Sequence, residues 1–144
     1  MTDGDKATRV LERLNASNPD TLMAHLEMVY SAVGDDYLEA EMPVTPRVHQ
    51  PMGILHGGAT AALAESVGSA ASAMRLDLSR QVAVGMELNI NHVSSARSGK
   101  IIARAEAVHL GRSTHLWDIR VRDHDDRLIA VARLRMMVLD RQSN

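Results

Sequence analysis

The feature that most constrains this fold is a long segment of very small residues. Between Gly57 and Ala73, thirteen of seventeen residues are Gly, Ala or Ser, and a loop-like stretch with Pro51 and Gly53 comes before them. Small side chains allow a neighbouring helix or sheet to approach closely, but the glycines lower the intrinsic helix propensity. We therefore predict a helix from Gly57 to about Leu76 that depends on packing against other elements for its stability.

The periodicity of the chain changes after this segment and becomes typical of β-strands. A similar alternation of apolar and polar residues also occurs once before it, over residues 36–44. The four alternating segments that follow the small-residue segment are 81–93, 100–110, 113–122 and 127–139. One long helix together with several alternating strands indicates an α+β fold, in which an antiparallel sheet packs on the helix.

The beginning of the chain is predicted to be helical. Apolar residues recur at helical spacing within residues 6–15 and again within 21–33, and Gly34 offers a stop for the second helix. A chain of 144 residues suits one compact core. We therefore expect a helical segment over residues 1–34 and a single domain over residues 35–144.

Composition and charge exclude several classes of function. The chain has no cysteine, which rules out disulfides, thiolate metal sites and a cysteine nucleophile. Its net charge of −2 gives no reason to expect nucleic-acid binding, and its seven histidines lack the spacing of metal ligands. The sequence contains neither a signal-peptide pattern nor a membrane span. We expect a cytoplasmic protein that has no metal and no membrane or nucleic-acid partner.

Glu65 is the candidate catalytic group of the predicted helix. From Val48 to Met74 it is the only formally charged residue. A buried, unpaired carboxylate is costly, and carboxylates in such settings often act as a base or a nucleophile. Glu65 could equally lie on a solvent-exposed face of the helix, so the pattern leaves both a catalytic and an exposed, non-catalytic Glu65 open. Ser69 shares the face of Glu65 one turn later, where it could orient Glu65 or a water molecule, or simply pack.

His56, Gly57 and Gly58 open the predicted helix. The first N–H groups of a helix lack partners within the helix and lie at the positive end of its dipole. Glycine lets a ligand oxygen approach these groups closely, so negative charge that develops on a carbonyl oxygen would be stabilised here. Alternatively, the two glycines only permit a tight turn. His56 could be a helix cap or a polar loop residue.

The residues from Gln50 to Ser69 resemble the signature of the hotdog-fold thioesterases. The resemblance continues through residues 84–92, 95–99 and 109–114. The pattern is most similar to one branch of these enzymes. That branch contains the 4-hydroxybenzoyl-CoA thioesterase of the Arthrobacter type, the 1,4-dihydroxy-2-naphthoyl-CoA thioesterase of menaquinone synthesis and the enterobactin proofreading thioesterase.

This resemblance implies a hotdog fold, in which a curled antiparallel sheet wraps around one long central helix. It also implies a homo-oligomer, a dimer or homotetramer, with active sites between subunits. The implied reaction is hydrolysis of an acyl-CoA thioester, so CoA is part of the substrate and no cofactor is needed. The implied catalytic residues are Gln50, His56 and Gly57, with Glu65 and Ser69 contributed by the other subunit. The implied substrate-binding residues are His92, Arg97, Arg112, Ser113 and Thr114.

Several functions remain open at the level of sequence. The acyl group of the CoA thioester could be aryl, such as hydroxybenzoyl or 1,4-dihydroxy-2-naphthoyl, or it could be a medium-length chain. Aromatic residues make up only 2% of the chain, which removes one common means of stacking an aryl group. A module that binds acyl-CoA without cleaving it is an alternative, as is a proofreading thioesterase acting on aryl groups bound to an acyl carrier protein. Glu65 could serve as the nucleophile or as a general base.

Overall fold

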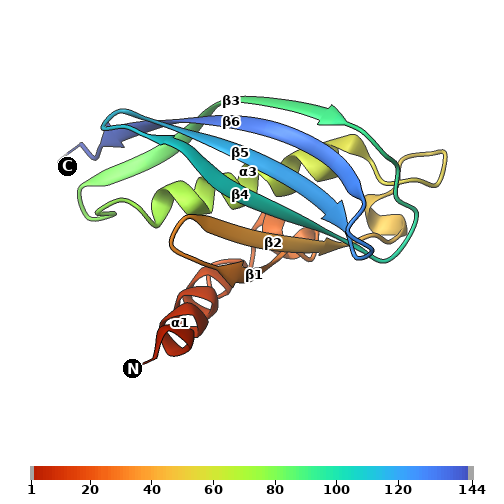
Figure 1. Cartoon of the computed structure of the whole chain (residues 1–144), viewed down its shortest axis with the longest axis horizontal. Helices are drawn as coiled ribbons and strands as arrows, with labels where there is room; N and C mark the ends of the chain where they lie inside the picture. The colour runs from red at the N-terminus through yellow and green to blue at the C-terminus, as the bar shows by residue number, and fades with distance from the viewer. Residues whose placement is uncertain (1, 143–144) are drawn as a thin grey trace.

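A single curled antiparallel sheet lies over one long helix in the computed structural model, which describes residues 2–142 (Figure 1). The strand order within this range is β1-β2-β4-β5-β6-β3. The helices are α1 Asp3–Asn15, α2 Leu22–His25 and α3 Gly57–Ala73, with a short 3-10 turn at Pro46–Val48. The strands are β1 Val29–Val33, β2 Tyr37–Pro43, β3 Gln81–His92, β4 Lys100–Leu110, β5 Thr114–Asp123 and β6 Leu128–Asp140. The predicted α+β hotdog fold is confirmed.

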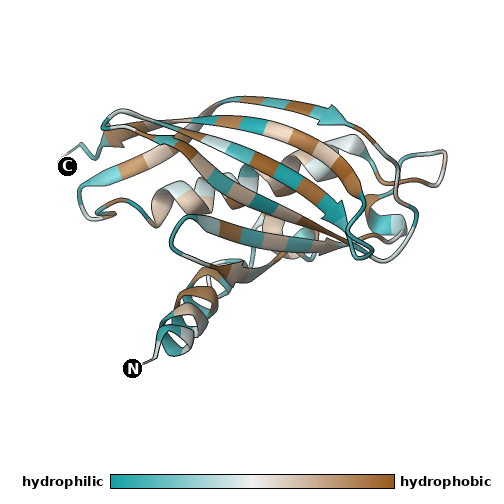
Figure 2. Ribbon diagram, viewed as in Figure 1, coloured by the Kyte–Doolittle hydropathy of each residue, from teal (hydrophilic) through white to brown (hydrophobic). Residues whose placement is uncertain are grey.

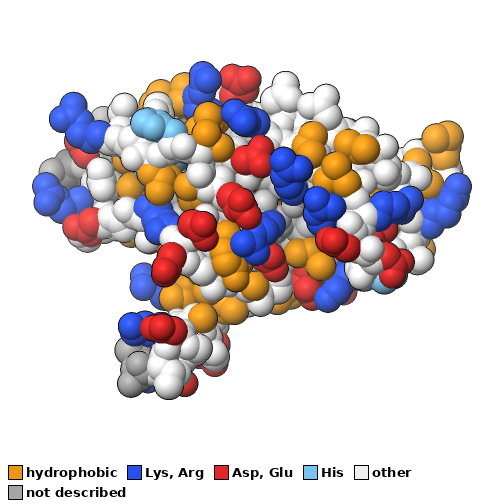
Figure 3. All heavy atoms as spheres, in the orientation of Figure 1, with side chains coloured by type: hydrophobic (Ala, Val, Ile, Leu, Met, Phe, Trp, Pro, Cys, Tyr) orange, Lys and Arg blue, Asp and Glu red, His pale blue; other side chains and the backbone are white. Residues whose placement is uncertain are grey.

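Strand alternation places the core between the sheet and α3. Along β2, every second side chain is buried, and along β5 the same holds for Trp117, Ile119 and Val121. Figure 2 shows the resulting bands of hydrophobic and hydrophilic residues along the strands. The opposite face of the sheet carries intermixed positive and negative side chains (Figure 3), including Arg104 at 2.9 Å from Glu39 and 2.6 Å from Glu106. One face of each strand therefore builds the core, and the other is a polar surface.

The small residues of α3 allow the sheet to approach the helix closely. At Gly68, an added Cβ would lie 2.5 Å from Leu134 Cδ2 and 3.1 Å from Ile119 Cδ1. Real Cβ atoms are not found so close to another heavy atom, so larger side chains along this face would push the sheet away. This contact explains why a segment with modest helix propensity is nevertheless a helix of seventeen residues.

The predicted helix over residues 21–33 is wrong beyond His25. The backbone at Glu27 adopts φ 55°, a left-handed conformation that ends the helical path. The chain then enters β1, which pairs with β2 and buries Met28 and Tyr30 in the core. Burial of these side chains and the backbone pairing of β1 outweigh the local helical spacing. The sheet therefore begins inside the segment that the sequence indicated to be helical.

The predicted helix over residues 6–15 is confirmed as α1, which projects from the body of the molecule (Figure 1). Asn15 ties the carboxyl end of α1 to the sheet by hydrogen bonds. The Asn15 amide donates to the Tyr30 carbonyl and its oxygen accepts the Tyr30 N–H, both at 2.9 Å. Asn18 adds a third bond at 3.1 Å to the Met28 carbonyl. None of the helices within residues 2–142 is long and apolar enough to span a membrane.

Candidate active site

A tight turn before α3 positions the amino end of the helix. The Gln50 N–H donates to the Ile54 carbonyl at 2.8 Å, and the Gly53 N–H donates back to the Gln50 carbonyl at 2.9 Å. Gly53 has φ 75°, a conformation that favours glycine, and His49 and Leu55 form an antiparallel bridge across the turn. These bonds hold the side chain of Gln50 close to the start of the helix.

His56 is the N-cap of α3. Its Nδ1 accepts the Gly58 N–H at 2.8 Å, and its carbonyl accepts the N–H groups of Ala59 and Thr60. Of the two sequence interpretations of His56, the capping role is therefore the one that the geometry supports. No acceptor within residues 2–142 engages the N–H of Gly57. That group is free to donate to a ligand oxygen at the positive end of the helix dipole.

The Gly57 amide opens into a cavity of about 390 Å³, here called the amide pocket, which Gln50 and His92 also line. The His92 imidazole lies directly against Gly57, because an added Cβ there would be only 2.8 Å from His92 Nε2. The Gln50 side-chain oxygen accepts the Met52 N–H. The structure therefore brings together Gln50, Gly57 and His92, three of the residues that the sequence resemblance implied for the site.

Glu65 lies in a second, separate depression of about 550 Å³, the carboxylate pocket, between α3 and β3. In the single chain its side chain is exposed, and its carboxylate rests against the backbone of β3 at Gly85. An added Cβ at Gly85 would lie 2.9 Å from Glu65 Oε1, so a larger residue there would push the carboxylate out of its present position. Ser69 lines the same pocket, but its hydroxyl donates to Met136 Sδ at 3.8 Å.

Two residues of the carboxylate pocket were missed by sequence reasoning. Tyr30 lines it from β1, where burial raises the pKa of its hydroxyl to about 12, and the hydroxyl donates to the Ser66 carbonyl at 3.5 Å. Tyr30 was missed because the segment around it was assigned to a helix. Gly85 left a usable signal, since a glycine inside an alternating strand often marks close approach of another group.

A single chain does not unite the implied site residues. Glu65 lies eight residues after Gly57 on the same helix, a separation of about 12 Å along the axis. One thioester group is too small to contact both. Arg97 precedes β4, whereas Arg112, Ser113 and Thr114 follow its other end, so these two groups lie at opposite ends of the sheet (Figure 1). Within residues 2–142, no three potential metal-ligating side chains come together.

Comparison with known proteins agrees with this architecture. Residues 52–130 match the family described as the thioesterase superfamily. The chain is 46% identical to a crystallised variant of thioesterase PA1618 from Pseudomonas aeruginosa, with a TM-score of 0.90 over 91% of this chain and 94% of that one. It is 42% identical to thioesterase HI1161 from Haemophilus influenzae, with a TM-score of 0.87 over 90% of each chain.

A more distant relative has the same fold. The protein SAV0944 from Staphylococcus aureus is 39% identical, with a TM-score of 0.82 over 84% of this chain and all of that one. The matches to the Pseudomonas and Haemophilus proteins cover at least 90% of each chain. This chain therefore belongs to the thioesterase superfamily of hotdog-fold proteins, and it is a thioesterase.

Proposed function

We propose that this thioesterase hydrolyses an acyl-CoA to the free acid and CoA at a site shared by two copies of the chain. The observation that supports the proposal most strongly is that, within one chain, the N–H donor and the carboxylate lie in two different pockets. The amide pocket holds an uncommitted helix N–H beside an imidazole but no carboxylate, and the carboxylate pocket holds Glu65 but no such donor. Each pocket supplies what the other lacks.

The edge of the sheet offers a way to join the two pockets. Strand β3 is an edge strand of twelve residues, and its Val84 and Met86 side chains are 41% and 49% exposed. Long exposed edges with apolar side chains favour pairing with another strand. Pairing of two β3 strands about a twofold axis reverses the direction of α3, which turns the Gly57 end of one helix toward Glu65 of the partner subunit. It also brings opposite ends of the two sheets together, and with them Arg97 of one chain and Arg112 of the other.

The proposed chemistry follows from these groups. The Gly57 N–H donates to the thioester oxygen and stabilises the negative charge that develops there, with His92 and Gln50 beside it. In one route the Glu65 carboxylate attacks the carbonyl carbon, the CoA thiolate leaves and takes up a proton, and water hydrolyses the mixed anhydride. In the other route Glu65 takes a proton from the attacking water. Ser69 contributes to the wall beside the carboxylate.

The crystallised variants of a relative support this assignment. In SAV0944 from S. aureus, a glutamine at position 32 and a glutamate at position 47 have each been replaced by alanine, and those positions are fifteen residues apart. Gln50 and Glu65 have the same separation in this chain. The matching residue types and spacing suit a glutamine in the turn before the helix and a glutamate on the helix.

The substrate is proposed to be a CoA thioester with an aryl or medium-chain acyl group, as the resemblance to the hydroxybenzoyl-CoA and dihydroxynaphthoyl-CoA branch suggests. Arg97 and Arg112, with Ser113 and Thr114, are the proposed contacts to the CoA nucleotide, whose phosphates suit guanidinium donors. An acyl group carried by an acyl carrier protein would reach the same two pockets through its pantetheine arm. Comparing CoA thioesters with carrier-bound thioesters separates these substrates.

The decisive experiment follows CoA release with a thiol reagent for wild type and Glu65→Gln over a panel of acyl-CoAs. Loss of the carboxylate should lower kcat by about 10²–10⁴-fold, the usual contribution of a general base or nucleophile. Glu12→Gln, which alters an exposed glutamate on α1, is the matched control and should keep wild-type turnover. Wild-type turnover in a folded Glu65→Gln variant would contradict the assignment, and binding without CoA release by the wild type would favour the binding module.

Mixing two inactive variants tests whether the site is shared between chains. Glu65→Gln and Gly57→Ala each damage one half of the site. When they are unfolded and refolded together, random pairing in a twofold dimer should restore roughly a quarter of wild-type sites. If the mixture shows no more activity than the separate variants while still forming mixed dimers, both halves act within one chain and the shared site is wrong.

A further inference from the structure

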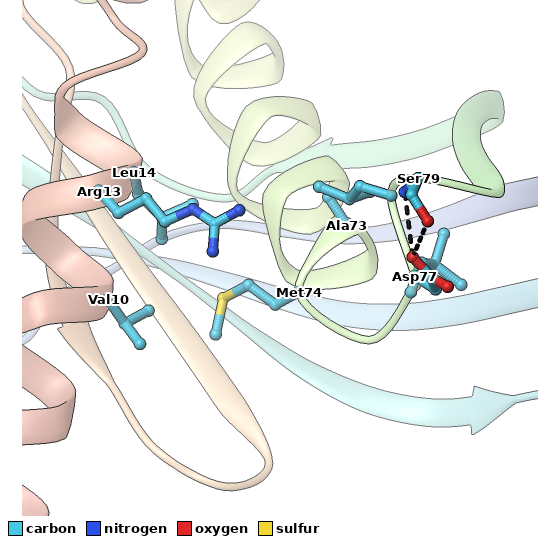
Figure 4. Close-up of a pocket in the computed structure, with 9 residues that line it drawn as sticks. Val10, Arg13, Leu14, Ala73, Met74, Asp77 and Ser79 are labelled. Carbon is cyan, nitrogen blue, oxygen red and sulfur yellow. Dashed lines mark hydrogen bonds between the residues drawn. The ribbon is translucent and has the colours of Figure 1, made fainter.

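A cavity of about 420 Å³ lies between α1 and the carboxyl end of α3 (Figure 4). Here called the α1 cavity, it has walls from α1, from the last residues of α3 and from the connection to β3. Its apolar lining is formed by Val10, Leu14, Ala73, Met74, Leu76 and Leu78. Such a lining holds water poorly and suits an apolar occupant.

Three polar residues, Arg13, Asp77 and Ser79, also line the α1 cavity. Asp77 accepts the N–H and the hydroxyl of Ser79 at 3.1 and 2.6 Å, so its carboxylate is already engaged (Figure 4). Arg13 extends from α1 toward α3 and carries the only positive charge among the lining residues. Met74 and Leu78 remain 37% and 41% exposed, and an apolar ligand in the cavity would cover them.

The α1 cavity adjoins the carboxylate pocket at one residue. Among residues 2–142, Ala73 alone lines both spaces. Glu65, Ser69 and Ala73 follow one another at intervals of one helical turn, so their small or flexible side chains lie along one face of α3. At Ala73 itself, the wall that the two spaces share carries only a methyl group. The distance along the helix from Glu65 to Ala73 is about 12 Å.

We infer that, of the acyl groups proposed above, this thioesterase selects flexible aliphatic chains over aryl groups. We infer further that chains beyond medium length also fit, because their distal end passes Ala73 and lies in the α1 cavity. The inference rests on the proposed function, since it starts from a thioester held at Glu65. An extended alkyl chain advances only about 1.25 Å per carbon, because its bonds of about 1.5 Å follow a zigzag. About ten carbons are therefore needed to span the roughly 12 Å from Glu65 to Ala73. Dodecanoyl and longer chains therefore reach the cavity, whereas benzoyl and butyryl groups end before it.

Helix α1 then helps to set which length of acyl chain the enzyme accepts. Val10 and Leu14 form the far wall of the cavity, and they come from a helix whose carboxyl end is fixed by Asn15. The residue at position 73 sets the width of the passage, and α1 sets how much chain can be accommodated beyond it. Apolar contact along the cavity raises the affinity for long chains roughly in proportion to the area that they bury.

The experiment measures kcat/KM for butyryl-, octanoyl-, dodecanoyl-, palmitoyl- and benzoyl-CoA, each below its micellar concentration. Wild type should prefer dodecanoyl- and palmitoyl-CoA. Ala73→Leu fills the passage and should lower the ratio of palmitoyl to octanoyl kcat/KM by about tenfold or more. Val10→Phe, which fills the cavity from α1, should lower the same ratio and serves if Ala73→Leu does not fold. Ala16→Leu adds the same bulk at the exposed end of α1 and should leave the ratio unchanged.

The outcomes separate this inference from the proposed function. A wild-type preference for butyryl- or benzoyl-CoA, or an unchanged palmitoyl-to-octanoyl ratio in folded Ala73→Leu and Val10→Phe, overturns the inference. Glu65-dependent hydrolysis of the short substrates would in that case leave the proposed function intact. Failure to hydrolyse any acyl-CoA would instead contradict the proposed function itself.

Discussion

Replacing Ser72 with alanine should destabilise the protein far more than the loss of one hydroxyl suggests. Ser72 is completely buried on α3, and its Oγ lies 2.7 Å from Trp117 Nε1 and 3.0 Å from His115 Nδ1. The indole N–H can only donate, so the serine oxygen accepts it, and the same hydroxyl donates to or accepts from His115 Nδ1 according to the tautomer of the ring. One hydroxyl therefore satisfies two buried groups of β5 and ties that strand to the helix.

The expected cost follows from the two groups that Ser72→Ala would leave without a partner. Each buried, unsatisfied polar group costs about 1–3 kcal/mol, and alanine gains back roughly 0.5 kcal/mol of helix propensity. We expect a loss of about 2–5 kcal/mol in the free energy of unfolding, measured by urea denaturation at fixed protein concentration with circular dichroism as the probe. In the Trp117→Phe background, where the indole donor is absent, Ser72→Ala should cost less. A change below about 0.5 kcal/mol in the wild-type background would refute the assignment of both hydrogen bonds.

Two further predictions concern stability against pH and the geometry of the amide pocket. Burial lowers the pKa of His115 below its usual value of 6.5, so below that pH the unfolded chain takes up a proton that the folded protein resists. The contribution of His115 to the free energy of unfolding should therefore be level above this value and fall as the pH decreases, by at most about 1.4 kcal/mol per pH unit. Urea titrations at several pH values should show that His115→Gln removes this contribution. An identical pH slope in the variant would contradict the assignment to His115. Gly57→Ala places a Cβ 2.8 Å from His92 Nε2, so the imidazole must move and the Cβ enters the space beside the amide, and kcat should fall by about 10²-fold. Gly4→Ala, whose Cβ meets nothing closer than 3.8 Å, should leave kcat unchanged, and equal turnover in folded Gly57→Ala would contradict the role of this amide.

Local sequence patterns predicted most of the secondary structure, because the spacing of apolar residues along a strand or a helix depends only on neighbouring positions in the chain. Alternation identified β2 and the four long strands to within a residue or two, and the small residues identified α3. The pattern failed between residues 26 and 33, where apolar residues happen to recur at helical spacing. That spacing is compatible with a strand once Met28 and Tyr30 have a core to enter, and no local signal revealed the left-handed turn at Glu27.

For the candidate site, too, local features were predictable from the sequence and contacts between distant segments were not. Residue types and their spacing along one helix can be read directly from the sequence. The sequence therefore predicted a carboxylate at position 65 after a glycine-rich helix start. The sequence did not reveal that His92 rests on Gly57, that Glu65 lies against Gly85, or that the two pockets share no lining residue, and these facts came from the structure. It also created the α1 cavity beside Ala73. These contacts join segments far apart in the chain, and such contacts depend on how the whole core packs.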